Sequence, residues 1–79
     1  MRAISCEQRV EIGRRLRDLR GEKPREAIAL EIGVTANAIT NYENGVRVPT
    51  DDLKMKLAKY FGKTVQEIFY DGLPEGPDD

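Results

Sequence analysis

Histidine is absent from this sequence, and cysteine occurs once, at Cys6. A Ser/His or Cys/His catalytic pair and a Cys/His zinc cluster both lack their parts, so we expect no enzyme, no metal and no cofactor. A single cysteine forms no internal disulfide framework, and no apolar run is long enough for a signal peptide or a membrane span. These absences predict a protein of the reducing cytoplasm without a membrane partner.

The chain is short, and its charge is unevenly distributed. Its 79 residues are 39% hydrophobic and 34% charged, which is typical of one small globular domain. Such a domain buries a thin core, so no enclosed substrate cavity is expected, and stability can depend on a partner subunit. The net charge of −1 alone argues against nucleic-acid binding. However, residues 1–50 carry nine Lys or Arg and seven Asp or Glu, against four and seven in residues 51–79, so the acidity lies mainly towards the C-terminus.

Helical periodicity and capping signals begin near the N-terminus. Ser5 and Gln8 have the spacing of a capping box, and an apolar stripe follows, so residues 6–20 are predicted to form the first helix. Pro24 fits the first turn of a second helix, which Gly33 ends. The predicted buried positions of these two helices are Ile12, Leu16, Leu19, Ile28, Ala29 and Ile32.

Three further helices are predicted. Thr35 is the expected N-cap of a third helix, which Gly45 ends, and Pro49 and Thr50 start a fourth. Thr64 with Glu67 repeats the capping-box spacing at the start of a short fifth helix. The predicted inward positions are Ala38, Ile39, Tyr42, Leu53, Leu57, Ala58, Phe61, Val65, Ile68 and Phe69.

The overall organisation follows from these helices. No strand alternation and no internal repeat occur, so the predicted fold class is all-α. The final stretch, "DGLPEGPDD", is acidic and rich in glycine and proline, which is typical of a flexible tail. We therefore assign residues 1–70 to one helical domain and residues 71–79 to an acidic flexible tail.

The joint between the second and third helices is the most informative feature. Ala29 is small where two helices would cross closely, Gly33 tolerates a left-handed turn, and Ile39 can pack back onto the second helix. Through "AIALEIGVTANAITNYENGVRVPT" and "LAKYFGKTVQEIF", about residues 8–69 resemble the helix-turn-helix family of phage repressor and Cro proteins. The resemblance implies a compact five-helix repressor-like DNA-binding domain whose third helix enters the major groove.

Some positions depart from the family pattern. Arg25 stands where the family commonly has Gln, and the turn before it, "GEKP", is about two residues shorter than usual. The recognition helix of the family often carries Arg or Gln at the positions of Ala36 and Asn41. The base preference therefore cannot be copied from a relative.

One face of the third helix is polar but uncharged. At about 100° per residue, Ala36, Asn37, Thr40, Asn41 and Asn44 fall opposite the apolar side. Asn and Thr are poor helix formers, so folding does not explain them. An Asn side chain matches the donor and acceptor of adenine in the major groove, and a small Ala or Thr can meet the thymine methyl. We predict base reading by Ala36, Asn37, Thr40 and Asn41 with a preference for A·T pairs; a tolerated polar surface is the alternative.

Phosphate contacts are expected from residues that flank this face. Arg25 lies at the start of the second helix, where the helix N-terminus also attracts anions, and Arg47 lies just beyond the third helix. Thr35 and Asn44 could add uncharged phosphate contacts. Either arginine could instead be ordinary surface charge.

The first helix is rich in arginine: Arg9, Arg14, Arg15, Arg17 and Arg20. Acidic residues are interleaved at spacings that give local ion pairs: Glu7, Glu11 and Asp18. We therefore interpret this side as a solvated face rather than a basic DNA face. By resemblance, Arg20 pairs with Glu43 and ties the first helix to the recognition helix.

One copy offers few phosphate contacts, so we predict a homodimer on a palindromic operator with half-site centres about 34 Å apart. The expected contact is the surface around Phe69, Tyr70 and Leu73, unless these residues seal the core. The predicted function is sequence-specific binding of double-stranded DNA by a transcriptional regulator, acting as a repressor. The alternative is a protein-interaction module, such as an antitoxin or a regulatory subunit. No small-molecule ligand is evident from the sequence.

Overall fold

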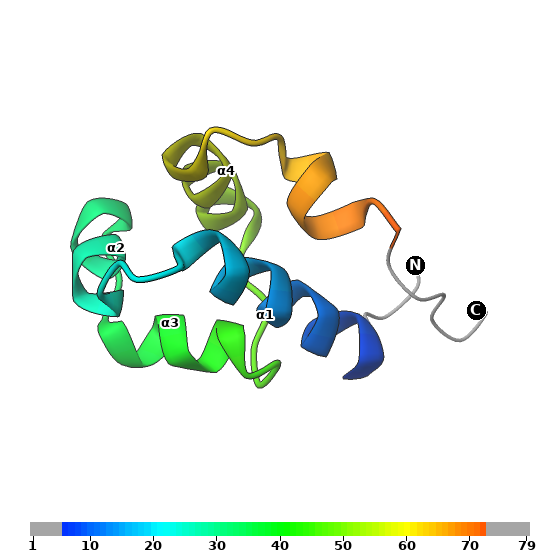
Figure 1. Cartoon of the computed structure of the whole chain (residues 1–79), viewed down its shortest axis with the longest axis horizontal. Coiled ribbons are helices and arrows are strands. Elements are labelled where there is room, and N and C mark those ends of the chain that lie inside the picture. Colours follow the sequence, from blue (N-terminus) through cyan, green and yellow to red (C-terminus); the bar gives the residue numbers. More distant parts are fainter. Residues whose placement is uncertain (1–5, 73–79) are drawn as a thin grey trace.

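The computed structural model describes residues 6–72, which contain helices and no strand (Figure 1). The helices are α1 (Cys6–Arg20), α2 (Arg25–Ile32), α3 (Ala36–Glu43), α4 (Asp51–Phe61) and the π-helix η1 (Gln66–Tyr70). In the view of Figure 1, α1 runs through the middle, with α3 on one side and α4 and η1 on the other. None of these described helices has the length and apolar character needed to cross a lipid bilayer. The predicted all-α class is confirmed.

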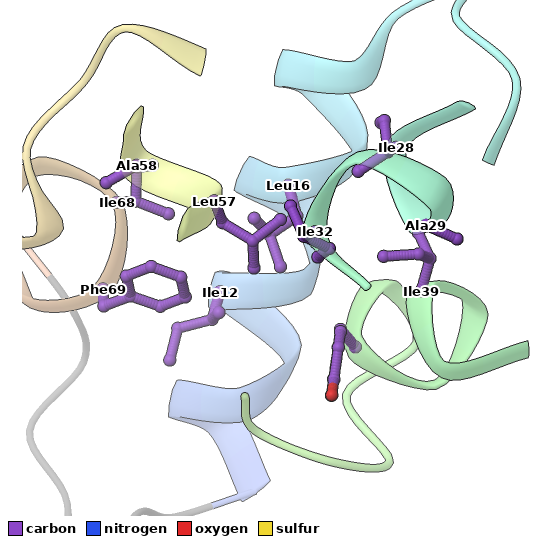
Figure 2. Close-up of a cluster of buried hydrophobic side chains, with 11 residues drawn as sticks. Ile12, Leu16, Ile28, Ala29, Ile32, Ile39, Leu57, Ala58, Ile68 and Phe69 are labelled. Atoms are coloured by element: carbon purple, nitrogen blue, oxygen red, sulfur yellow. The ribbon is translucent and has the colours of Figure 1, made fainter. Parts of the chain in front are cut away.

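The core forms where the five helices meet, and Figure 2 shows its side chains converging from all of them. The buried apolar residues are Ile12, Leu16, Ile28, Ala29, Ile32, Ile39, Tyr42, Leu57, Ala58, Ile68 and Phe69. Other predicted inward residues are only partly buried against this cluster: Leu19, Ala38, Leu53, Phe61 and Val65. Burying one large apolar side chain contributes about 1.5–3 kcal/mol, so this cluster is the main source of stability.

Side-chain caps set the start of α3 at the predicted Thr35 and the start of α4 at Thr50, so Pro49 lies before α4. Thr35 Oγ1 accepts a hydrogen bond from Ala38 N at 3.1 Å, and Thr50 Oγ1 accepts one from Leu53 N at 3.5 Å. Each threonine thereby bonds an amide of the first turn, and Ala38 N donates to Thr35 O at 3.1 Å as well. Pro24 differs from the prediction. With a ψ of 145° it is extended, so it precedes α2 instead of lying in its first turn.

The predicted capping box opens the final helix. Thr64 N donates to Glu67 Oε1 at 3.0 Å, and Glu67 N donates to Thr64 Oγ1 at 3.1 Å. The winding that follows is wider than in an α-helix, because Asp71 N donates to Gln66 O, five residues earlier, at 2.8 Å. A short fifth helix is therefore present, in the π form.

Of the two roles left open for Phe69, the structure shows the second: its side chain seals the core. Phe69 is only 1% exposed, because its ring fills the interior (Figure 2). Tyr70 is 48% exposed, and its hydroxyl accepts a hydrogen bond from Lys54 Nζ at 3.1 Å. Leu73 lies outside the described residues, as do Ser5 and most of the predicted tail.

Candidate nucleic-acid interface

A tight turn sets the direction of α3 relative to α2. Gly33 ends α2 with a φ of 81°, and the amides of Gly33 and Val34 both donate to Ala29 O at 2.9 Å. Ala29 and Ile39 are each 3% exposed, so the small alanine lets the isoleucine of α3 pack closely on α2. This arrangement is the predicted helix-turn-helix.

Gly13 fixes α3 from the side of α1. A Cβ atom placed on Gly13 would lie 2.6 Å from the carbonyl carbon of Glu43 and 2.7 Å from Tyr42 O, and closer still to Glu43 O. These are backbone atoms, which cannot rotate away. Only glycine therefore allows α1 and α3 to approach this closely. No local signal predicts this contact, because one glycine inside a helical pattern has many explanations.

The predicted base-reading residues lie together on the outward side of α3. Asn37 is exposed, while Ala36, Thr40 and Asn41 are half-buried. Within residues 6–72, no hydrogen bond occupies the side-chain amide of Asn37 or Asn41. Thr40 Oγ1 donates its proton to Ala36 O at 3.2 Å, so this hydroxyl offers only lone pairs and its methyl group to an outside partner.

A buried carboxylate joins three helices behind this face. The side chain of Glu43 is 1% exposed, and its two oxygens accept hydrogen bonds from Arg20 Nε at 2.6 Å and Arg20 Nη2 at 3.2 Å. This confirms the expected pair between α1 and α3. The hydrogen bond to Glu43 raises the pKa of Arg20. The ion pair and its hydrogen bonds hold the C-terminal end of α3 against α1.

Arg25, a predicted phosphate ligand, shares this carboxylate. Its Nε lies 3.1 Å and its Nη2 3.0 Å from Glu43 Oε1, while 37% of its side chain is exposed. One carboxylate thus binds two guanidinium groups. The bonds from Nε and Nη2 to Glu43 fix the orientation of the Arg25 side chain. Sequence reasoning missed this contact because α2 and α3 come together only in the folded chain.

Arg47 lies exposed in the loop after α3. The amides of Val46 and Arg47 both donate to Asn41 O, at 2.9 and 3.3 Å, which anchors the loop to the last turns of the helix. In the described part of the chain, no carboxylate lies within ion-pair distance of Arg47. The charge of Arg47 is therefore not neutralised by a carboxylate of the described residues.

The two uncharged phosphate candidates lie at opposite ends of α3. Thr35 is exposed at its N-terminus, with its hydroxyl oxygen already used as the cap. Asn44 is exposed at its C-terminus, and its Oδ1 accepts a hydrogen bond from Arg17 Nη2 at 3.0 Å. The structure thus brings one arginine of α1 to the edge of the polar face, a position that helical periodicity does not predict.

Other arginines of α1 form the predicted local ion pairs. Arg14 lies 2.6 Å from Glu11 and 2.8 Å from Asp18, and Arg15 lies 3.1 Å from Glu11. Hydrogen bonds from Arg14 and then Arg15 lower the pKa of Glu11 to about 2. Arg15 also donates to Ile68 O at 3.3 Å, which ties α1 to η1.

The sequence can also be compared with known families. Residues 14–68 match the sequence profile of a family described as helix-turn-helix. The chain belongs to the helix-turn-helix family. This is a family of DNA-binding transcriptional regulators. No curated protein gives a significant sequence match.

Solved structures of helix-turn-helix proteins are similar over most of the chain. The restriction-modification controller protein C.AhdI from Aeromonas hydrophila is 31% identical, with a TM-score of 0.68 over 76% of this chain and 94% of its own. The P22 c2 repressor, solved with a synthetic operator, is 21% identical, with a TM-score of 0.72 over 75% of this chain and 92% of its own. The SOS-response transcriptional repressor LexA from Eubacterium rectale is 19% identical, with a TM-score of 0.74 over 99% of this chain and 87% of its own.

The helix-turn-helix of this chain contains no evident metal site. Within residues 6–72, no three His, Cys, Asp or Glu side chains are grouped so that they could hold a metal ion.

The surface around α3 combines an uncharged, amide-rich face with arginines at its borders. Both kinds of group suit a nucleic acid, which presents base edges and phosphates side by side.

Proposed function

We propose that this chain is a repressor that binds a palindromic operator as a homodimer, with α3 in the major groove. One observation carries the proposal: the outward face of α3 is uncharged, and the amides of Asn37 and Asn41 have no partner within the described residues. Asparagine has a low helix propensity, so neither folding nor solubility favours two of them here. Hydrogen bonding to base edges, by contrast, does favour asparagine at these two positions.

The side chains on this face suit A·T base pairs. An asparagine amide matches adenine, because its oxygen accepts from the N6 amino group while its nitrogen donates to N7. The hydroxyl proton of Thr40 is directed to Ala36 O, so Thr40 presents its methyl group and an acceptor. Ala36 adds a second small apolar contact for a thymine methyl.

Arg25 and Arg47 supply the charge that the reading face lacks. The Nε and Nη2 groups of Arg25 are bound to Glu43, so the side chain is already ordered before DNA binds. Its exposed N–H groups can then donate to a phosphate with little further loss of side-chain entropy. Arg47 lies in the loop after α3, which is bonded through its backbone amides to Asn41 O. Thr35 and Asn44 add contacts at the two ends of α3. We assign these four residues to the phosphate backbone.

Homodimer formation follows from the size of the site. One α3 contacts only a few base pairs, and a single small domain buries little surface on DNA, so strong discrimination needs two copies. Two copies related by a two-fold axis read a palindrome whose half-sites are about 34 Å apart, one helical turn.

A protein-interaction module is the second candidate. The net charge of −1 favours it, because proteins that bind nucleic acids commonly carry an excess of positive charge. Such a module would bind its partner equally well after Asn37→Ala. The two functions are therefore separable by one substitution.

Selection from a library of random duplexes with the purified protein tests the repressor proposal. We expect a symmetric consensus rich in A·T pairs. Asn37→Ala should lower discrimination at one base pair per half-site by about 1–3 kcal/mol, with the salt dependence unchanged because the lost amide carries no charge. Gln66→Ala is the control, because it removes an exposed amide far along the chain, on η1, where the amide donates to Asp71 Oδ1 at 2.8 Å. Equal affinity of the wild type for all duplexes would refute the proposal.

A further inference from the structure

Arg17 differs from the neighbouring arginines of α1. Arg14 and Arg15 are bound to carboxylates of the same helix, whereas Arg17 Nη2 donates to Asn44 Oδ1 at the end of α3 at 3.0 Å. The contact joins residues 27 positions apart, so it depends on the tertiary fold. It places an exposed guanidinium at the border of the face that the proposed function assigns to DNA.

The hydrogen bond determines which way the amide of Asn44 is turned. Guanidinium groups only donate, so the oxygen of Asn44 must face Arg17 and the Nδ2 group must face away. Asn37, Asn41 and Asn44 are spaced at i, i+4 and i+7, one stripe of a helix. In the described part of the chain no acceptor takes a bond from Asn44 Nδ2. Its two N–H groups are therefore left for an acceptor outside the protein.

The electrostatics of α3 give an independent reason for a cation at this place. A helix C-terminus carries a partial negative charge, which repels phosphate. The last turn of α3 contains Glu43 and no basic residue. Arg20 and Arg25 compensate the buried carboxylate, and Arg17 is the cation that lies at the exposed cap residue. Without Arg17, a phosphate near Asn44 would meet the partial negative charge of the helix C-terminus and be repelled.

We infer that Arg17 is a positioning residue for DNA binding: it turns the amide of Asn44 so that Nδ2 donates to a phosphate, and its charge makes that end of α3 attractive to the backbone. The inference rests on the proposed function and adds a residue of α1 to the binding surface. The contact carries affinity and register but no base preference.

Two substitutions on α1 separate this role from a general effect of charge. Arg17→Gln and Arg14→Gln each remove one positive charge from the same helix, but the guanidinium of Arg14 is bound to Glu11 and Asp18. Affinity for the selected duplex is measured against salt concentration by fluorescence anisotropy. Removal of one positive charge that neutralises a phosphate lowers the salt slope by about 0.9, which corresponds, relative to 1 M salt, to about an eightfold loss of affinity at 0.1 M salt for each protomer. We expect this for Arg17→Gln and not for Arg14→Gln.

Asn44→Asp tests the amide orientation. The carboxylate still accepts from Arg17, so the link between α1 and α3 is kept, but the outward donor becomes an acceptor with negative charge. We expect a larger loss of affinity than for Arg17→Gln, with the thermal midpoint within a few degrees of the wild type. Binding equal to the wild type would show that the contact is only structural and would overturn the inference.

The result for Arg17→Gln also decides the inference separately from the proposed function. If the wild type selects a consensus but Arg17→Gln and Arg14→Gln bind it equally at all salt concentrations, the role of Arg17 is refuted while the repressor proposal stands. If the wild type prefers no duplex, the proposed function is refuted, and this inference with it.

Discussion

Replacing Gly13 with alanine sets two effects of opposite sign against each other. Alanine is favoured over glycine inside a helix by about 1 kcal/mol, so α1 alone would become more stable. The new Cβ, however, would lie 2.6 Å from the carbonyl carbon of Glu43 and 2.7 Å from Tyr42 O. Relief of this overlap requires α1 and α3 to move apart, because the obstructing atoms belong to the backbone.

The overlap should dominate. Overpacking of a tightly packed contact costs about 1–3 kcal/mol, and a clash with backbone falls at the upper end of this range. After the gain in helix propensity, Gly13→Ala should lower the free energy of unfolding by about 2 kcal/mol. For a chain of this length that corresponds to a fall of roughly 8–16 °C in the thermal midpoint.

Urea unfolding followed by circular dichroism measures this loss. Gly21→Ala is the matched control for the position of α3. Gly21 has a φ of +57°, and a Cβ added there would meet nothing within 4 Å, so this variant loses a similar amount of stability, about 1–2 kcal/mol, through backbone strain but does not displace α3. We expect Gly13→Ala to weaken binding of the selected duplex as well, since α3 is displaced, whereas Gly21→Ala should not. A Gly13→Ala protein as stable as the wild type would refute the close approach of α1 and α3.

Two further predictions concern carboxylates. Glu43→Gln keeps the size of a side chain that is 1% exposed but removes the charge that faces two arginines. Loss of a buried ion-pair partner costs about 3–5 kcal/mol, but both arginines are partly exposed. We therefore expect the free energy of unfolding, measured with urea, to fall by about 2 kcal/mol. An unchanged unfolding midpoint would contradict it. The pKa of Glu11 is about 2 in the folded chain, below its ordinary 4.5, so its contribution to stability is present above about pH 4.5 and is lost as the pH falls towards 2. Glu11→Gln should therefore lose less stability than the wild type over this interval, and parallel acid-unfolding curves would refute this account.

Local signals in the sequence were sufficient for most of the helical framework. Thr35 and Thr50 mark helix starts because a cap uses atoms within three residues, and Thr64 with Glu67 forms both expected hydrogen bonds for the same reason. The apolar stripes identified the core because burial follows the helical period. The polar face of α3 could be predicted in the same way.

Contacts between distant segments could not be predicted from such local signals. The approach of Gly13 to α3, the second arginine on Glu43 and the bond from Arg17 to Asn44 all depend on how the helices are placed. Whether Phe69 belonged to the core or to a dimer contact was open, because periodicity shows that a residue is apolar but not how far the core extends. The roles of the predicted DNA-contacting residues remain predictions.

The division of α3 into two faces has a consequence for how new operators can arise. Its folding contacts are made through Ile39, Tyr42 and Glu43, which are buried, whereas Asn37 is exposed and its side chain is unused within the described residues. Exchange of an exposed side chain usually changes stability by no more than about 0.5 kcal/mol. With base reading by α3 as proposed, mutation can alter the preferred base pairs while the scaffold stays folded, so duplicated copies of such a gene can diverge towards separate targets in single steps.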